Sequence, residues 1–148
     1  GYHCWLSNSQ VALFIVDQPH NRLILVDTKD QSQETLESIN VGRCLKRTPQ
    51  GQLAFIDKET SNNWVITTYD LRTKEYTRVI KTLSGSEDFE ILKDGSYIMG
   101  QGTKLYHYDP SNGEIKGWQE VTDLRYYDIH KITRLAVSAN NRLALVAE

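Results

Sequence analysis

Short apolar strands and tight polar turns alternate along the chain, and one arrangement of them recurs four times. In each copy a short strand leads into a polar pair, and a second, more apolar strand follows. The polar pairs are Asn8-Ser9, Gln50-Gly51, Asp94-Gly95 and Asn140-Asn141. Most of these residues tolerate a positive φ, which predicts two-residue hairpin turns. The pairs begin at positions 8, 50, 94 and 140, at intervals of 42, 44 and 46 residues, which is typical of repeats that each form a four-stranded sheet.

The second strand of each copy is almost wholly apolar, as in residues 11–16, 53–56 and 143–146. A strand with one solvated face alternates between apolar and polar residues, whereas a continuous apolar run indicates burial of both faces. The middle strands of a propeller blade are buried in this way because each blade packs between two others. Outer strands such as residues 76–79 alternate and suit a solvated rim. No window shows the apolar stripe of an amphipathic helix, so the predicted fold class is all-β. Together with the repeat, the buried middle strands predict a partial β-propeller.

A second landmark follows in three of the copies, where a strand ends in an aspartate and a polar turn begins. The three aspartates are Asp27, Asp70 and Asp109. An aspartate side chain in this position accepts a hydrogen bond from the backbone two residues further on. We therefore interpret the three residues as turn formers rather than as ligands.

These landmarks divide the chain into blades at residues 1–39, 40–83 and 84–124, with an incomplete blade at 125–148. The prediction is thus about 3.5 four-stranded antiparallel blades. A blade face left open at each end would expose on the order of 500 Å² of apolar surface, at a cost of about 12 kcal/mol. That is as large as the whole stability of a typical domain, about 5–15 kcal/mol. We expect the remaining blades to come from the same gene product or from a second copy of the chain.

The composition of the chain carries no strong charge. Its 148 residues include 17 basic and 19 acidic ones, a formal net charge of −2, and the basic residues are scattered. Nucleic acids are attracted by a positive electrostatic field, which this chain lacks, so no nucleic-acid partner is expected. No apolar run approaches the ~18 residues of a membrane-spanning helix, so we expect no membrane insertion. Cys4 and Cys44 have no metal or redox spacing and are interpreted as two buried thiols, with one disulfide as the alternative.

Several turn segments resemble the PD40 repeats, the WD40-like units of TolB-type six-bladed propellers. The repeat signature is S-P-D-G-K before an apolar strand, followed by an L-Y-x-x-D strand. Degenerate copies of the first half lie at residues 48–52, 92–96 and 138–142, and residues 104–109 match the second half. The resemblance covers essentially the whole chain. It implies a six-bladed parent ring and a periplasmic or otherwise exported bacterial protein that binds a protein or peptide partner.

Ligands of propellers usually meet the loops at one end of the central channel, and loops on a rigid scaffold concentrate binding residues. The binding candidates placed in these loops are His20, Arg43, Trp64, Glu87, Asp88, Gln101, Tyr126, Tyr127 and His130. A further candidate, Arg134, follows the last of these loops. Three of the candidates, Tyr126, Tyr127 and His130, lie in the longest connection and suit the binding of a peptide, because tyrosine is favoured at interfaces. The alternative is that they pack over the channel mouth.

An acidic cluster of Glu87, Asp88 and Glu90 lies at the entrance of an inner strand. Hard cations need several oxygen ligands, and the alternative is a channel-lining cluster paired with Arg43 or Arg134. The histidines share no ligand spacing and the chain has no catalytic motif, so neither a metal nor a cofactor is predicted. The sequence favours a non-catalytic binding scaffold. A metal-dependent, lactonase-like propeller with Glu87 or Asp88 as ligand and the substrate-gating propeller of a serine peptidase stay open as alternatives.

Overall fold

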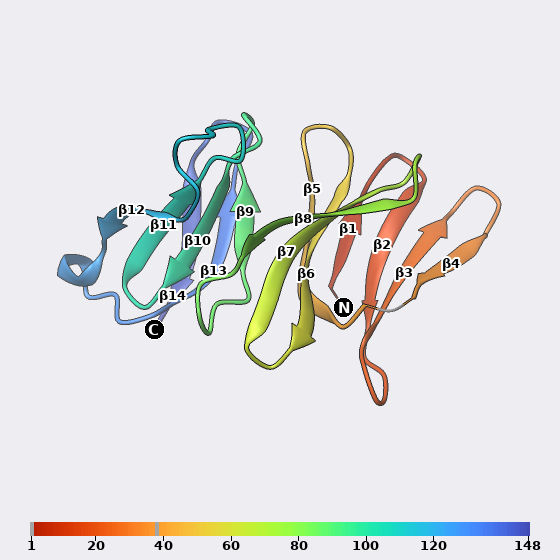
Figure 1. The fold of residues 1–148 in the computed structure, drawn as a ribbon, viewed down its shortest axis with the longest axis horizontal. Coiled ribbons are helices and arrows are strands. Elements are labelled where there is room, and N and C mark those ends of the chain that lie inside the picture. The colour runs from red at the N-terminus through yellow and green to blue at the C-terminus, as the bar shows by residue number, and fades with distance from the viewer. Residues whose placement is uncertain (1, 38) are drawn as a thin grey trace. The chain divides into compact units, whose positions relative to one another are not determined.

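The computed structural model describes residues 2–37 and 39–148, and nearly all of its regular structure is β-strand. The strands fall into two compact units, Gly1–Thr82 and Leu83–Glu148 (Figure 1). Each unit is built from antiparallel sheets whose strands lie side by side in chain order. The prediction of an all-β fold made of four-stranded antiparallel sheets is confirmed. No helix in the described part of the chain has the length and apolar character needed to cross a bilayer.

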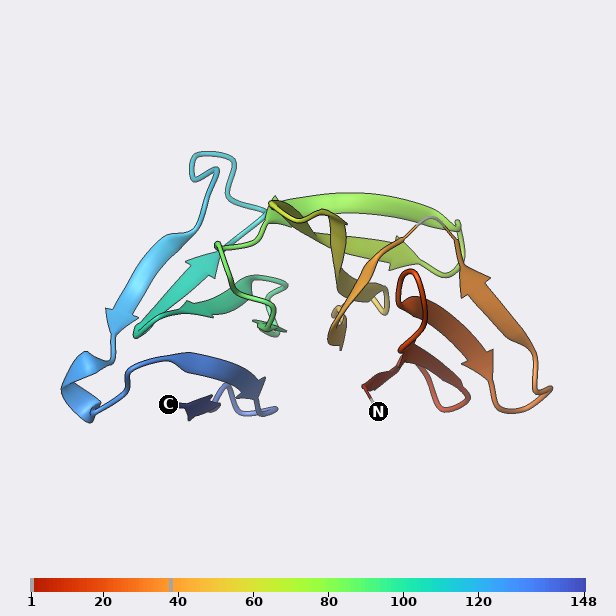
Figure 2. The same cartoon turned by 90° about the horizontal axis from the view of Figure 1, so that it is seen from below.

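The first unit holds two four-stranded sheets. The first sheet consists of β1 (His3–Trp5), β2 (Gln10–Ile15), β3 (Arg22–Asp27) and β4 (Gln33–Leu36). The second consists of β5 (Val41–Arg47), β6 (Leu53–Thr60), β7 (Asn63–Asp70) and β8 (Glu75–Lys81). Figure 2 shows the two sheets facing each other, with β5 of the second sheet next to β1 and β2 of the first.

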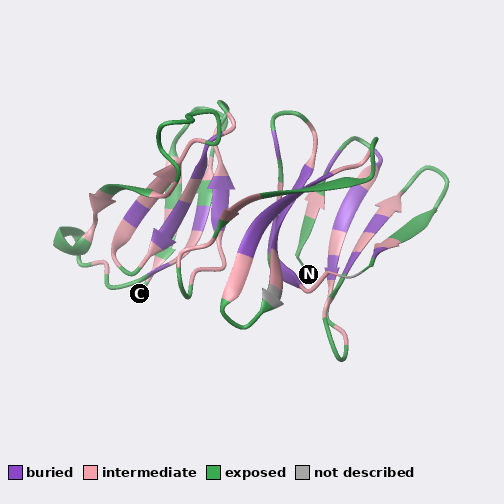
Figure 3. Cartoon of the chain, viewed as in Figure 1, coloured by how far each residue is buried: buried purple, intermediate pink, exposed green. Residues whose placement is uncertain are grey.

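The core of this unit lies between the two sheets. Ala12, Phe14 and Leu23 of the first sheet pack with Leu45 and Phe55 of the second. Along β6 all four residues from 53 to 56 are completely buried, although their side chains alternate between the two faces of the sheet. Purple segments in the middle strands of Figure 3 mark this burial. Burial of both faces, predicted from the continuous apolar run, is confirmed for this strand. The same prediction is wrong for β14 (Leu143–Ala147), where Ala144 and Val146 are exposed.

The second unit holds one four-stranded sheet and one β-hairpin. The sheet consists of β9 (Phe89–Ile91), β10 (Tyr97–Gln101), β11 (Lys104–Tyr108) and β12 (Gln119–Asp123). A single turn of 3-10 helix, η1 (Arg125–Tyr127), leads to the hairpin of β13 (Ile132–Val137) and β14 (Leu143–Ala147). The hairpin packs on the sheet through β13, which contacts β9 and β10.

The packing of β13 on the sheet requires a glycine. A Cβ atom on Gly100 would lie 2.7 Å from Cγ2 and 2.9 Å from Cβ of Ile132. Ile132 is buried together with Leu105 and Leu135, which form the small core between the sheet and the hairpin. Because real Cβ atoms do not approach other atoms so closely, any larger residue at position 100 would push the hairpin away.

The repeated hairpins have longer turns than the predicted two-residue ones. The Thr48 N–H donates to the Gln52 carbonyl (2.9 Å) and the Gly51 N–H donates to the Thr48 carbonyl (2.9 Å), with Gly51 at φ 83°. The same pattern recurs with Gly95 at φ 88° and Asn141 at φ 55°. In these three pairs only the second residue is left-handed, whereas a two-residue type I′ turn needs both, and Ser9 of the first pair has no positive φ. The prediction of two-residue turns is therefore wrong, and these are three-residue loops closed by one left-handed residue.

The three strand-ending aspartates begin their turns as predicted. Asp27 Oδ1 accepts a hydrogen bond from the Lys29 N–H (2.9 Å), and Asp70 Oδ1 accepts one from Arg72 (2.8 Å). Asp109 Oδ1 accepts one from the N–H of the second residue after it, Ser111 (2.8 Å). The three residues are therefore turn formers.

The two cysteines lie in the first unit and are not joined by a disulfide. Cys44 is buried, as expected, whereas Cys4 on the short strand β1 is only half-buried. The prediction of two thiols is confirmed, and the expectation that both are fully buried is wrong for Cys4. β1 has only three residues, and the side chains on either side of Cys4 are exposed.

Candidate binding surface

Three connections of the second unit meet at one end of its sheet. They are residues 83–88, which are the part of the β8–β9 loop in this unit, the β10–β11 turn and the β12–β13 connection. The β10–β11 hairpin holds the other two, because the Leu124 N–H donates to the Thr103 carbonyl (2.8 Å) and the Gln101 side-chain amide donates to the Ser84 carbonyl (2.8 Å). The predicted gathering of these connections at one end is thus present in this unit. Gln101 is the last residue of β10 rather than a loop residue, and it ties the β8–β9 loop in place.

The β12–β13 connection, residues 124–131, is named the tyrosine loop below. Tyr126 and Tyr127 have 89% and 76% of their surface exposed, the largest fractions among the described aromatic residues. Within this unit both rings are exposed. Both tyrosines lie in η1, whose turn is closed by a hydrogen bond from the Tyr127 N–H to the Leu124 carbonyl (2.9 Å).

Asp123, at the end of β12, holds the start of the tyrosine loop. Its carboxylate accepts hydrogen bonds from the Arg125 N–H (3.1 Å), from Arg125 Nε (2.8 Å) and from the Thr103 hydroxyl (2.7 Å). The hydrogen bonds from the Arg125 side chain, followed by that from Thr103, hold the pKa of Asp123 far below its usual range. The charged form of the carboxylate is therefore favoured, and it anchors the start of the loop.

The far end of the tyrosine loop is also held. The His130 and Lys131 N–H groups both donate to the Glu148 carbonyl, at 2.7 and 2.9 Å. His130 Nε2 lies 3.6 Å from Asp128 Oδ1, and both side chains are largely exposed. His130 therefore lies on the same loop as the tyrosines, as predicted, and its side chain is exposed.

Asp88 joins the sheet to the hairpin. Its Oδ2 accepts a hydrogen bond from the Leu135 N–H (2.6 Å), and its Oδ1 lies 3.6 Å from Nη1 of Arg134. Only 15% of the Asp88 side chain is exposed. Of the two arginines that the sequence offered as partners, Arg134 on β13 is thus the one that pairs with Asp88. Both contacts hold β13 against the sheet, so the Asp88 carboxylate has a structural role.

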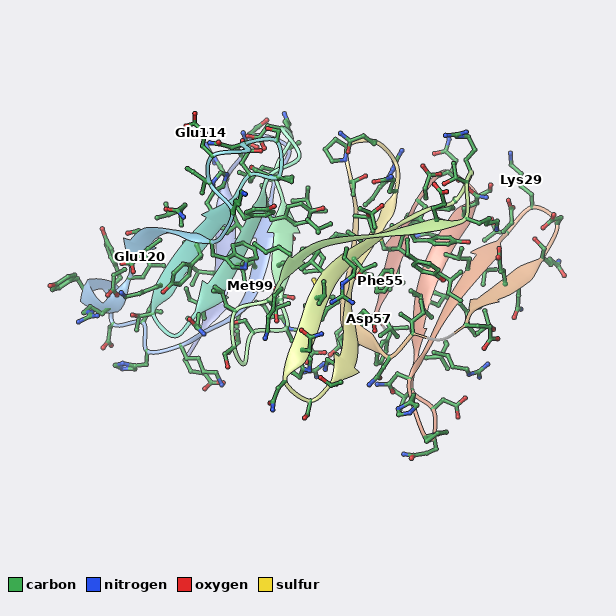
Figure 4. All side chains as sticks on the ribbon, viewed as in Figure 1. Lys29, Phe55, Asp57, Met99, Glu114 and Glu120 are labelled. Carbon is green, nitrogen blue, oxygen red and sulfur yellow. The ribbon has the colours of Figure 1, made fainter. Side chains whose placement is uncertain are left out.

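The other acidic residues near Asp88 do not gather into a metal site. Glu87 is half-buried in the β8–β9 loop and Glu90 is buried on β9. Among the described residues, no group of three or more His, Cys, Asp or Glu side chains is placed to hold a metal ion. Lys104 near the same end pairs locally, with its Nζ 2.7 Å from Oε2 of Glu120 on β12. Figure 4 labels Glu120.

The first unit carries the remaining candidates, and two of them lie in strands rather than loops. Arg43 belongs to β5, where a register shift separates Val41 from Leu45, and its guanidinium lies 5.8 Å from the centre of the Tyr2 ring. Trp64 is the second residue of β7, and Lys58 Nζ lies 4.3 Å from its ring centre. The prediction of loop positions for these two residues is wrong. The backbone hydrogen bonds of both strands extend further than the apolar run indicated.

His20 lies in the β2–β3 connection and is exposed, as predicted. Asp17 organises this connection by accepting hydrogen bonds from the Gln18 N–H (2.8 Å) and from Arg22 Nε (2.6 Å). The Gln18 hydrogen bond, followed by the contact with Arg22, lowers the pKa of Asp17. The loop is therefore ordered at its base.

Sequence reasoning missed two features of the described chain. Asp123 was not recognised as an anchor, although it ends a strand in the same way as Asp27 and Asp70, and this position could have revealed it. A groove of about 240 Å³ between the two sheets of the first unit was also missed. Its walls come from residues far apart in the sequence, such as Leu25 and Lys74, and no local motif signals it.

Comparison with known proteins identifies the fold. No protein-family model and no curated protein sequence matches the chain. Among solved structures, TolB from Acinetobacter baumannii is 19% identical with a TM-score of 0.73, over 100% of this chain and 37% of that chain. The tricorn protease is 17% identical with a TM-score of 0.62, over 99% of this chain and 15% of that one. The extracellular domain of the putative hybrid two component system BT4673 from B. thetaiotaomicron is 10% identical with a TM-score of 0.53, over 99% and 25%.

At these identities the likeness shows the fold alone. The chain has the fold of a TolB-like β-propeller, and it is a partial propeller that spans 37% of the length of the TolB chain. The resemblance drawn from the turn motifs is thus confirmed at the level of the fold.

Proposed function

We propose that the chain is a non-catalytic binding scaffold of the TolB-like propeller type, and that its tyrosine loop binds a protein or peptide partner. The observation that carries this proposal is the exposure of Tyr126 and Tyr127, at 89% and 76%, on a loop held at both ends. Tyrosine supplies a large, amphipathic contact area at low cost in conformational entropy, because it has only two side-chain torsions. Two neighbouring tyrosines that add nothing to the core suit such a contact.

The tyrosine loop is held at both ends before it meets a partner. A flexible loop loses conformational entropy when it binds, and this cost is subtracted from the affinity. The bonds of Asp123 to Arg125 and of Glu148 to His130 already fix the loop before a partner arrives. The tyrosine rings are therefore presented by a rigid support, which favours recognition by shape.

The setting of this scaffold is also part of the proposal. The TolB-like fold supports a location in the periplasm or elsewhere outside the cytoplasm of a bacterium, as the resemblance of the turn motifs implies. The remaining blades of a ring come from the same gene product or from a second copy of the chain. Neither a membrane-inserted segment nor a nucleic acid takes part.

A peptide-display selection tests the proposal. A library of random peptides is selected against the 148-residue chain, and the enriched peptides are measured by fluorescence anisotropy. We expect the double substitution Tyr126→Ser with Tyr127→Ser to weaken their binding at least about tenfold, as truncation of a central aromatic contact does. Ile115→Ser, which alters an exposed apolar residue in the β11–β12 connection, is the matched control and leaves the binding unchanged.

Two outcomes would contradict the proposal. One is the failure of any peptide to enrich in repeated selections. The other is enrichment of peptides that bind the double variant as tightly as the unchanged chain, which would place the partner on another surface.

A further inference from the structure

A groove between the two sheets of the first unit has the form of a small-ligand site. It is lined on one side by residues of the first sheet and its turns, and on the other by the β7–β8 turn. The lining residues are Gln10, Leu25, Val26, Asp27, Ser32, Gln33, Glu34, Leu71 and Lys74. Both sides belong to the same compact unit. We name this feature the rim groove.

The rim groove has the size of a small metabolite. Its volume of about 240 Å³ equals the liquid volume of roughly eight water molecules, at about 30 Å³ each. Pockets for drug-sized ligands hold about 300–1,000 Å³, so this groove suits a ligand below that size. A free amino acid is of this order, whereas a nucleotide or a sugar chain is not.

Opposite charges face each other across the rim groove. Lys74 of the β7–β8 turn donates a hydrogen bond to the carboxylate of Glu34 on β4. About half of each side chain is exposed, 53% for Lys74 and 48% for Glu34, and ion pairs this accessible to water are weak. The pair therefore opens at little cost. An opened pair offers one ammonium group and one carboxylate to a ligand that carries the complementary charges.

Asp27 and Tyr69 add to the charge pattern around this pair. Asp27 lines the groove, and its Oδ1 and Oδ2 accept from the Lys29 N–H (2.9 Å) and the Ser9 hydroxyl (3.5 Å). The hydrogen bond to Glu34 raises the pKa of Lys74, and the nearby Tyr69 hydroxyl acts in the same direction. Lys74 supplies positive charge to the groove, and Glu34 and Asp27 supply negative charge beside it.

The apolar part of the lining indicates that the ligand also has an aliphatic group. Leu25 is buried and Leu71 is half-buried, and both line the groove. An aliphatic side chain placed against them would lose contact with water, which is favourable in proportion to the area covered. A ligand for the whole groove therefore combines an ammonium group, a carboxylate and a short apolar chain.

The backbone of the β7–β8 turn points to a role for the lysine itself. Lys74 has a φ of 62°, in the left-handed region that glycine and asparagine occupy with less strain. The turn is closed by a hydrogen bond from the Lys74 N–H to the Asp70 carbonyl (2.8 Å), which any residue could make. A lysine in this position keeps a strained conformation, and its side chain reaches the rim groove.

The geometry points to a binding site in the rim groove for a free aliphatic α-amino acid. The amino acid inserts between Lys74 and Glu34. Its carboxylate replaces Glu34 as the acceptor for the Lys74 ammonium. Its own ammonium group meets the carboxylates of Glu34 and Asp27, and its side chain lies against Leu25 and Leu71. One weak ion pair is exchanged for two, which is the source of the affinity.

A titration of the ¹⁵N-labelled chain with L-leucine, followed by NMR, tests this inference. We expect saturable shifts in the backbone amides of Leu25, Gln33 and Lys74 at millimolar concentration. N-acetyl-L-leucine lacks the ammonium group and L-leucinamide lacks the carboxylate, so each should bind at least about tenfold more weakly. The two analogues report separately on the two ends of the pair.

Variants locate the site and separate it from the tyrosine loop. Lys74→Gln should abolish the saturable shifts. Glu34→Gln should weaken them, and it serves as the test if Lys74→Gln does not fold. Lys104→Gln is the matched control, because Lys104 forms a comparable exposed pair with Glu120 on β12 but does not line the groove. The double tyrosine variant should respond to L-leucine in full, because the tyrosine loop does not line the groove. A failure of the proposed peptide binding would therefore not affect this inference.

Three results would overturn the inference. The first is the absence of saturable shifts with L-leucine in the unchanged chain. The second is an equal response to N-acetyl-L-leucine or to L-leucinamide, because one charged end would then suffice. The third is an unchanged response in folded Lys74→Gln.

Discussion

Substitution of Asp88 by alanine should weaken the attachment of the β13–β14 hairpin to the four-stranded sheet of the second unit. The carboxylate accepts the Leu135 N–H at 2.6 Å, and only 15% of the Asp88 side chain is exposed. A hydrogen bond to a charged acceptor contributes about 1.5–3 kcal/mol. The substitution also leaves the Leu135 N–H without that acceptor in a partly buried site. We expect Asp88→Ala to lower the free energy of unfolding of this unit by about 2–3 kcal/mol.

Two further variants separate the hydrogen bond from the ion pair. Arg134 lies 3.6 Å from Asp88 and is 40% exposed, so Arg134→Ala should cost no more than about 1 kcal/mol. Asp88→Asn keeps a side-chain oxygen for Leu135 but loses the charge, and its effect should fall between the other two. Glu114→Ala, which removes an exposed carboxylate from the same unit, is the control and should have no effect beyond about 0.5 kcal/mol.

Urea unfolding and amide hydrogen exchange measure these differences. A loss of about 2 kcal/mol should speed exchange of the Leu135 amide by about 30-fold if it exchanges through local opening. The reasoning is refuted if Arg134→Ala destabilises the chain as much as Asp88→Ala does. It is refuted equally if Leu135 exchanges at the same rate in Asp88→Ala as in the unchanged chain.

Three other predictions follow from the packing and the titrating groups. Gly100→Ala should cost about 1–3 kcal/mol in urea unfolding, because the new Cβ would overlap Ile132, whereas Gly113→Ala meets open space and should be nearly neutral. Burial raises the pKa of Asp57 (beside Phe55 in Figure 4) above its ordinary 3.8, so its contribution to stability is lost as pH rises through the raised value. Asp57→Asn should therefore be more stable than the unchanged chain at pH 7 and equal to it at pH 3, by urea unfolding at both pH values. Burial raises the pKa of Tyr97 from 10.0 to about 12, so stability should fall as pH rises through that range, and Tyr97→Phe should remove this part of the loss in alkaline urea unfolding.

The architecture was predictable because local and tertiary preferences agree along this chain. Each hairpin places a turn-forming residue at the same point of the repeat, and the left-handed Gly51, Gly95 and Asn141 fall where the polar pairs were found. The apolar run at residues 53–56 predicted burial on both faces, which is typical of a strand between two packed layers, although the equally apolar residues 143–146 leave Ala144 and Val146 exposed. Such features depend on neighbours in the sequence and can be recognised without a structure.

The candidate site was only partly predictable because strand ends and long-range contacts leave little trace in the sequence. Trp64 was placed in a loop, yet β6 and β7 continue to pair as far as Thr60 with Asn63, because backbone hydrogen bonds hold polar residues in a ladder as well as apolar ones. The bond from Leu135 to Asp88 joins residues 47 positions apart. No periodicity or turn motif reports on a contact of that range.

A substitution at an anchor of the tyrosine loop tests whether the rigidity of the loop contributes to binding in addition to the two tyrosine rings. Asp123 contacts Arg125 and Thr103 but neither tyrosine ring in the hydrogen bonds that hold the loop. Asp123→Ala should therefore free the loop while leaving both rings chemically intact, and exchange of the Arg125 amide should become faster. If the tyrosines bind because they are held in place, peptides selected against the unchanged chain should bind this variant more weakly. Unchanged binding with a freed loop would show that the rings alone carry the affinity, and the argument from anchoring would then fail.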